Sequence, residues 1–158
     1  MLFRSVTANV EKALAITAEA NIDFATVESG VAATIDPTTA ASHSGIFGSP
    51  TVGLFFIDGT EGSTVSFTFG TATLVESVTG GDPITFTPNV IGHATDQASA
   101  TGITSTVTTV TLGAGTAPES NTDKFRLWVG GTLTAATGTG SYTTNHANGT
   151  DLNMQVDY

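Results

Sequence analysis

The chain of 158 residues has no cysteine and few charged side chains. Without cysteine it cannot form disulfides, cysteine-ligated zinc or iron–sulfur sites, or a cysteine nucleophile. Lysine and arginine number 4 against 14 aspartates and glutamates, so the formal net charge is −10. Four scattered cations cannot form the basic surface that binds nucleic acid or an anionic membrane, and we expect neither partner. No apolar run approaches the about 20 residues of a membrane-spanning helix, so we expect no membrane insertion.

The motifs of common catalytic sites are also missing. The chain has no Gly-x-Ser-x-Gly elbow, no phosphate-binding Gly-x-x-x-x-Gly-Lys loop and no Asp-x-Asp-x-Asp-Gly run. His43, His93 and His146 are far apart in sequence and lack metal-ligand spacing. The carboxylates are thinly spread, which favours turn and surface roles over the alternatives of a loop-built calcium site or a glycosidase pair. We therefore expect no enzyme activity, no cofactor and no metal.

Period-two alternation of apolar and polar residues dominates the chain and is typical of β-strands. Val65, Phe67 and Phe69, for example, alternate with threonine and serine. The pattern predicts about ten to twelve short strands, which indicates an all-β sandwich or barrel. The clearest predicted strands cover residues 6–16, 22–26, 52–57, 65–69, 73–75, 84–87, 104–112, 125–129, 132–134 and 152–158.

Glycine, proline and asparagine mark the predicted turns. We expect a hairpin connection at Asp58–Gly62, turns at Gly80–Pro83 and Gly130–Gly131, and a strand end at Pro88. Asn148-Gly149-Thr150 matches a glycosylation acceptor, but Asn-Gly is also the strongest two-residue hairpin signal. We interpret it as the turn before the last strand.

Three further segments carry weaker signals. Residues 34–50 and 114–123 are mostly small and polar, which predicts surface loops. Glu11–Ala20 is rich in residues of high helix propensity, but Leu14 and Ile16 continue the period-two pattern. We therefore favour a strand over the helical alternative there.

Five motifs follow one another in a fixed order along the chain. They are Leu14-Ala15-Ile16, Ile22–Gly30, Phe55–Gly62, Leu127–Leu133, and Gly140-Ser141-Tyr142 followed by Met154–Tyr158. In this order they resemble a family of exported bacterial domains that is known only as a domain of unknown function, although Ala25 stands where this family usually has glycine. The resemblance covers residues 13–158 and implies a secreted, immunoglobulin-like and pilin-like antiparallel β-sandwich, related to pilin and spore-coat-like adhesin domains. It implies no enzyme activity and no catalytic residues.

The segment of residues 1–12 lies ahead of the single predicted domain at 13–158. Val6, Ala8 and Val10, with Phe3 ahead of them, are spaced to place one apolar face into a groove. A donated strand of this kind would pair with a neighbouring copy by β-augmentation. The alternative is that the segment pairs within its own sheet or frays.

The most favoured function is a non-catalytic structural or adhesive domain of the bacterial cell surface. The most specific version of this hypothesis is a subunit of a pilus or filament. The alternative is a module that binds carbohydrate or another small ligand through loops near Trp128 or Tyr142. The resemblance places the protein outside the cell, although no apolar signal segment follows Met1. The residues alone leave open a cytoplasmic protein or an exported one given without its leader.

Overall fold

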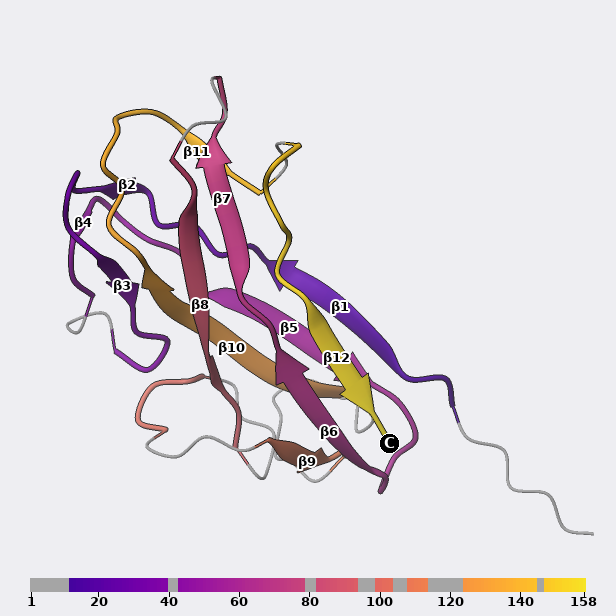
Figure 1. Cartoon of the computed structure of the whole chain (residues 1–158). Coiled ribbons are helices and arrows are strands. Elements are labelled where there is room, and N and C mark those ends of the chain that lie inside the picture. The colour runs from indigo at the N-terminus through magenta and orange to yellow at the C-terminus, as the bar shows by residue number, and fades with distance from the viewer. Residues whose placement is uncertain are drawn as a thin grey trace, which may run out of the picture.

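The described part of the chain consists of antiparallel β-strands joined by turns and loops (Figure 1). The computed structural model describes residues 12–39, 43–78, 82–93, 99–103, 108–113, 124–144 and 147–158, and within them it has twelve strands and no helix. The predicted all-β antiparallel class is confirmed. The strands are β1 (Ala15–Ala20), β2 (Thr26–Val27), β3 (Ala33–Ile35), β4 (Ile46–Phe47), β5 (Gly53–Asp58), β6 (Thr64–Phe69), β7 (Ala72–Glu76), β8 (Ile84–Ile91), β9 (Thr109–Thr111), β10 (Lys124–Leu133), β11 (Tyr142–Thr143) and β12 (Met154–Asp157).

Seven of these strands form one large sheet, which curls so that the fold resembles a half-barrel (Figure 1). Its order is β1-β5-β10-β8-β7-β11, and β3 also pairs with β10. A second sheet has the order β12-β6-β9, and β2 pairs with β4 alone. Only Gly70 and Thr71 separate β6 from β7, so the chain passes directly from the small sheet into the large one.

The small sheet covers one half of the inner face of the large sheet. Val65 and Phe67 of β6 pack in one apolar cluster with Ile57 of β5 and with Phe125 and Leu127 of β10. Four of these five side chains have 0% exposure, and Phe67 has 5%. We name this part of the molecule the covered half. In the large sheet, β5 lies between β1 and β10.

The outer face of the large sheet carries its own smaller core. Trp128 of β10 packs with Ile91 and Ala100 and is 8% exposed. Arg126, two residues earlier, is buried with its guanidinium carbon 5.2 Å from the centre of the Phe56 ring. The favourable cation–π geometry is one reason why a cation is tolerated on this face.

The structure corrects two predictions on β8 and β10. Gly130 and Gly131 do not form a turn, because β10 continues through them to Leu133. A Cβ at Gly130 would collide with the carbonyl oxygen of Ile35, and one at Gly131 with that of Thr87. The glycines are therefore needed for close approach of β3 and β8 to β10. Pro88 does not end its strand either. Beyond Phe86, β10 is the one described strand that pairs with β8, so among the described strands the other side of β8 has no ladder for the proline to interrupt.

Two loop predictions are also wrong. Asp58–Gly62 is not a hairpin connection, because β5 and β6 belong to different sheets. The predicted loop at 34–50 contains the end of β3, where Ile35 has no exposed area, and all of β4. Short strands of two or three residues are too brief to show alternation. In contrast, β1 confirms the strand preferred over a helix within Glu11–Ala20.

Candidate binding groove

The inner face of the large sheet is open beyond the covered half. A cleft of about 600 Å³ adjoins a second of about 490 Å³. We name the two together the sheet groove. It lies between residues 21–29 on one side and residues 138–152 on the other, and its floor comes from β7, β8 and β10. Both clefts share the lining residues Ile22, Phe24, Leu74, Leu133 and Tyr142.

The first rim is an extended segment fixed by backbone hydrogen bonds. The amide of Asp23 donates to the carbonyl oxygen of Thr51 at 3.0 Å, and the amide of Thr51 donates back at 2.7 Å. The Asp23 carboxylate accepts a 2.8 Å hydrogen bond from the amide of Ala25, which has a left-handed φ of 54°. This local bond stabilises a backbone conformation that normally favours glycine. Ala25 thus holds the bend that carries the rim from Asp23 into β2.

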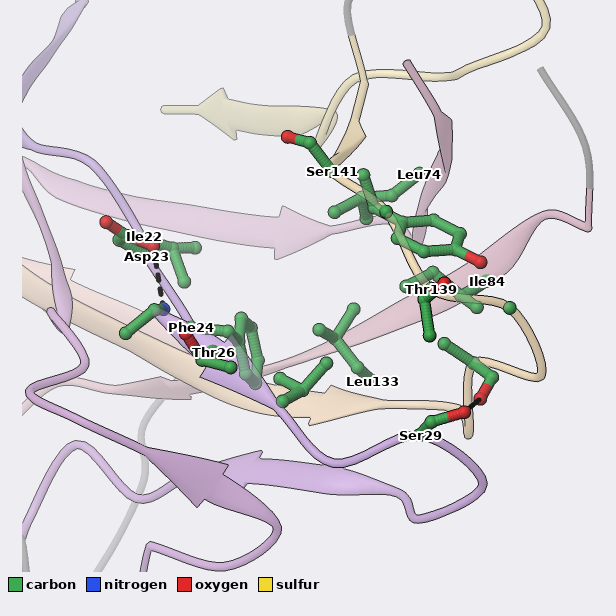
Figure 2. Close-up of a pocket in the computed structure, with 16 residues that line it drawn as sticks. Ile22, Asp23, Phe24, Thr26, Ser29, Leu74, Ile84, Leu133, Thr139 and Ser141 are labelled. Carbon is green, nitrogen blue, oxygen red and sulfur yellow. Dashed lines mark hydrogen bonds between the residues drawn. The ribbon is translucent and has the colours of Figure 1, made fainter. Parts of the chain in front are cut away.

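The floor of the groove is apolar. Ile84 and Phe86 of β8 and Leu133 of β10 are at most 4% exposed, whereas Leu74 of β7 is half-buried. Phe24 reaches from the rim to pack edge-on against Phe86, with 5.8 Å between ring centres. Figure 2 shows Leu133 between Phe24 on one side and Leu74 and Ile84 on the other. The apolar surface that a bound group would meet therefore comes from the half-buried side chains of Phe24, Leu74 and Tyr142, which lie above a largely buried floor.

The second rim combines small residues with one aromatic ring. It runs through Gly138, Thr139, Gly140 and Ser141 to Tyr142, whose strand β11 pairs with β7. One end of the groove is closed where the Ser29 hydroxyl and the Gly30 amide donate to the Ala136 carbonyl oxygen, at 3.4 and 2.7 Å. The other end reaches Leu152, two residues before β12.

The groove combines apolar side chains with hydrogen-bonding groups. Its lining contains no histidine, lysine or arginine, and its carboxylates belong to Asp23 and Asp151. Serine, threonine and tyrosine hydroxyls and the rim backbone supply hydrogen-bonding groups beside the apolar floor. Such a surface can bury an apolar face and satisfy polar edges, as an added β-strand requires.

The residues predicted to donate a strand, Phe3, Val6, Ala8 and Val10, lie outside the described residues. His146 also lies outside them. The His43 Nε2 is 3.0 Å from the carbonyl oxygen of Asp36, which fixes that ring locally. Within the described ranges, no three or more histidine, aspartate or glutamate side chains gather closely enough to hold a metal ion.

The two aromatic residues named for ligand binding differ in position. Trp128 is buried on the outer face, so it offers no open ring face for stacking on a sugar. Tyr142 lines the sheet groove. The interpretation of Asn148-Gly149 as a turn is confirmed, since a turn at residues 147–148 precedes β12.

Sequence reasoning did not find the groove itself, because its rims come from segments more than 100 residues apart. Comparison with known proteins adds no relative: no family model, no curated protein and no solved structure matches the chain significantly. The described residues contain no helix with the length and hydropathy of a membrane span.

Proposed function

We propose that the chain is a non-catalytic structural or adhesive subunit of the bacterial cell surface, built as a pilin-like and immunoglobulin-like sandwich that receives a strand. In this proposal the N-terminal segment of one copy, through Val6, Ala8 and Val10, fills the sheet groove of the next copy. The single observation that carries the proposal is the open groove, along which the half-buried side chains of Phe24, Leu74 and Tyr142 keep part of their apolar surface exposed beside the two-layered covered half.

The pattern of the segment suits the groove. In an extended strand, residues 6, 8 and 10 point to one side at about 7 Å intervals. Small and branched apolar side chains at that spacing fit a floor made of Leu74, Leu133 and their neighbours. At the end of the groove, β12 is the edge strand of the small sheet and can accept backbone hydrogen bonds from an added strand.

Deletion of residues 1–11 tests the proposal directly. We expect the full chain to form oligomers in size-exclusion chromatography with light scattering, and the deleted chain to be a folded monomer with unchanged circular dichroism. A synthetic peptide of residues 1–11 should then bind the deleted chain. Oligomers of unchanged size after deletion would contradict strand donation.

A matched pair of substitutions locates the acceptor. Leu74 and Leu54 are both half-buried leucines of the large sheet, but Leu74 lines the groove and Leu54 packs against Trp128 on the outer face. Leu74→Gln should weaken peptide binding at least tenfold, because it places an amide on the apolar floor. Leu54→Gln should lower stability similarly and leave peptide affinity unchanged.

A carbohydrate or small-ligand module is the second candidate, because Tyr142 and several hydroxyls line the same groove. In that case the deleted chain would ignore the peptide and bind a glycan array, and Tyr142→Ala would abolish the signal. Filaments in negative-stain micrographs of the full chain would favour the structural subunit instead.

A further inference from the structure

Tyr158, which follows β12, is hydrogen-bonded to Lys12, which precedes β1. The Tyr158 hydroxyl donates to the carbonyl oxygen of Lys12 at 2.6 Å and accepts from the amide of Thr60 at 3.0 Å. The amide of Lys12 donates to the Thr60 hydroxyl at 2.6 Å. One phenol thus joins three segments that are up to 146 residues apart in sequence. We name these three residues the terminal clamp.

The clamp is closely packed although Tyr158 is 49% exposed. A Cβ placed on Gly59 would lie 2.8 Å from the Tyr158 hydroxyl oxygen and 2.7 Å from a methyl carbon of Leu112. The hydroxyl therefore occupies space that only glycine leaves open. In addition, the Lys12 ammonium lies 2.7 Å from the Asp58 carboxylate, on the strand that leads to Thr60.

The clamp and the sheet groove lie at opposite ends of the same flank. Strands β1 and β12 run in opposite directions along this flank (Figure 1). β1 leads from the clamp toward the groove rim at Asn21, and β12 leads from the groove end at Leu152 back to the clamp. The distance from the clamp to the groove can be followed along β5. Lys12 lies beside Thr60, and Ala20 pairs with Leu54, which precedes Thr60 by six residues. Six extended residues span about 20 Å.

This separation decides which groove the N-terminal segment can fill. To reach its own groove, the segment would have to reverse at Lys12, and a reversal uses at least two residues. Val6 would then lie at most about 14 Å from Lys12, and Ala8 and Val10 closer still. Val6, Ala8 and Val10 would all fall short of a groove that begins about 20 Å away, and only Phe3 and its immediate neighbours could reach it. The groove of a second copy carries no such restriction.

We propose that the Tyr158 hydroxyl is a positioning group that fixes the root of the N-terminal segment at Lys12, and thereby makes a second copy of the chain the acceptor of that segment. This inference rests on the proposed strand donation and specifies its partner. It also gives Tyr158 a role in assembly, although this residue does not line the groove.

Trypsin cleavage after Lys12 reports on the clamp without reference to assembly. Cleavage requires the Lys12 backbone to leave Thr60 and Tyr158, so its rate follows the population of the opened clamp. Tyr158→Phe keeps the ring and removes two hydrogen bonds. We expect cleavage after Lys12 to accelerate fivefold to tenfold in dilute monomer, as followed by mass spectrometry. Ser66→Ala is the matched control, since it removes a bond to Asp157, one residue away, and should not change the rate.

Two binding measurements complete the test. The peptide of residues 1–11 should bind chains that lack this segment with affinities equal within twofold, whether or not they carry Tyr158→Phe, because the groove is untouched. Assembly of the full chain should weaken at least fivefold in Tyr158→Phe. A purely structural role would instead lower peptide binding and assembly together.

The outcomes separate the clamp from the proposed function. A wild-type chain that stays monomeric and ignores the peptide overturns strand donation, and the role in assembly with it. If the wild-type chain assembles and the Tyr158→Phe variant has the same rate of cleavage after Lys12 and the same assembly, the role of the clamp is overturned while strand donation stands. Faster cleavage with weakened assembly and unchanged peptide affinity supports the proposal.

Discussion

The two halves of the inner face of the large sheet have similar floors and different covers. In the covered half, Phe125 and Leu127 lie under the small sheet and have no exposed area. In the other half, Leu133 of the same strand is buried by its neighbours, but Leu74 and Tyr142 remain partly exposed along the sheet groove. The difference arises at Gly70, where the chain leaves the small sheet and enters the large one as β7. Beyond Phe69, no part of β6 remains to form the second layer.

This comparison shows that the groove does not result from a shortage of apolar residues. Its floor joins one continuous cluster that includes Ile84, Phe86 and Val129. An apolar surface of this kind is stabilised by whatever removes it from water. The groove half is therefore the part of the fold whose stability should respond to an added strand, whereas the covered half should not respond.

Truncation of a phenylalanine should have the largest effect and should differ between the halves. Phe125→Ala leaves a cavity under the small sheet and should lower the free energy of unfolding by about 3–5 kcal/mol. Phe24→Ala, on the groove rim, should cost about 1–2 kcal/mol, because water already reaches the ring. Urea denaturation followed by circular dichroism measures both. Equal losses would mean that the two halves are packed alike.

A methyl group at Gly131 should have the next largest effect, since β10 serves both halves. Gly131 has a φ of 148°, and a Cβ there would meet the Thr87 carbonyl and the Phe86 ring. Gly131→Ala should therefore cost about 2–3 kcal/mol. Gly62→Ala is the control, since Gly62 has a φ of 81° with nothing near its Cβ, and should cost about 1 kcal/mol. A similar loss in both variants would contradict a role for Gly131 in close strand approach.

These glycines also show where the sequence was informative and where it was not. Alternation predicted β5, β6 and β7 nearly to their observed bounds, because every second side chain of each strand faces a packed layer. Gly130–Gly131 was predicted as a turn because glycine permits turns and close approach alike, and only the positions of Ile35 and Thr87 decide between them. Pairing partners such as β3 with β10 depend on contacts between distant segments, which a local pattern does not contain.

The site was less predictable than the fold. A groove exists where no second layer covers the sheet, and no residue pattern marks the place after β6 where the chain leaves the small sheet for the large one. Trp128 shows the converse error: a lone tryptophan suggested a ligand-stacking ring, yet its large apolar area is buried against Ile91 and Ala100. At the groove, Ala25 adopts a left-handed φ that normally favours glycine, and an alanine gives no sequence signal for such a bend.

Replacement of Ala25 by glycine should stabilise the groove half slightly. Relief of the left-handed strain gives about 1–2 kcal/mol, and the added freedom of glycine in the unfolded chain takes back about 0.5–1 kcal/mol. We expect a net gain of about 0.5–1 kcal/mol in urea denaturation. Peptide binding should not change, since the Asp23 carboxylate still accepts a hydrogen bond from the backbone amide of residue 25. A loss of stability would mean that the alanine methyl contributes packing that outweighs the strain.

The smallest effect should come from Asp58→Asn, which removes the ion pair with Lys12. The lysine side chain is 48% exposed and the aspartate 22%, so water and salt screen their attraction. We expect a loss of at most about 0.5 kcal/mol, measured by urea denaturation at low and high salt, and at most a twofold change in tryptic cleavage after Lys12. If Asp58→Asn instead opened the chain at Lys12 as much as Tyr158→Phe, charge rather than the phenol would hold the segment. The root of the N-terminal segment would then become salt-dependent, and so would any assembly built on it.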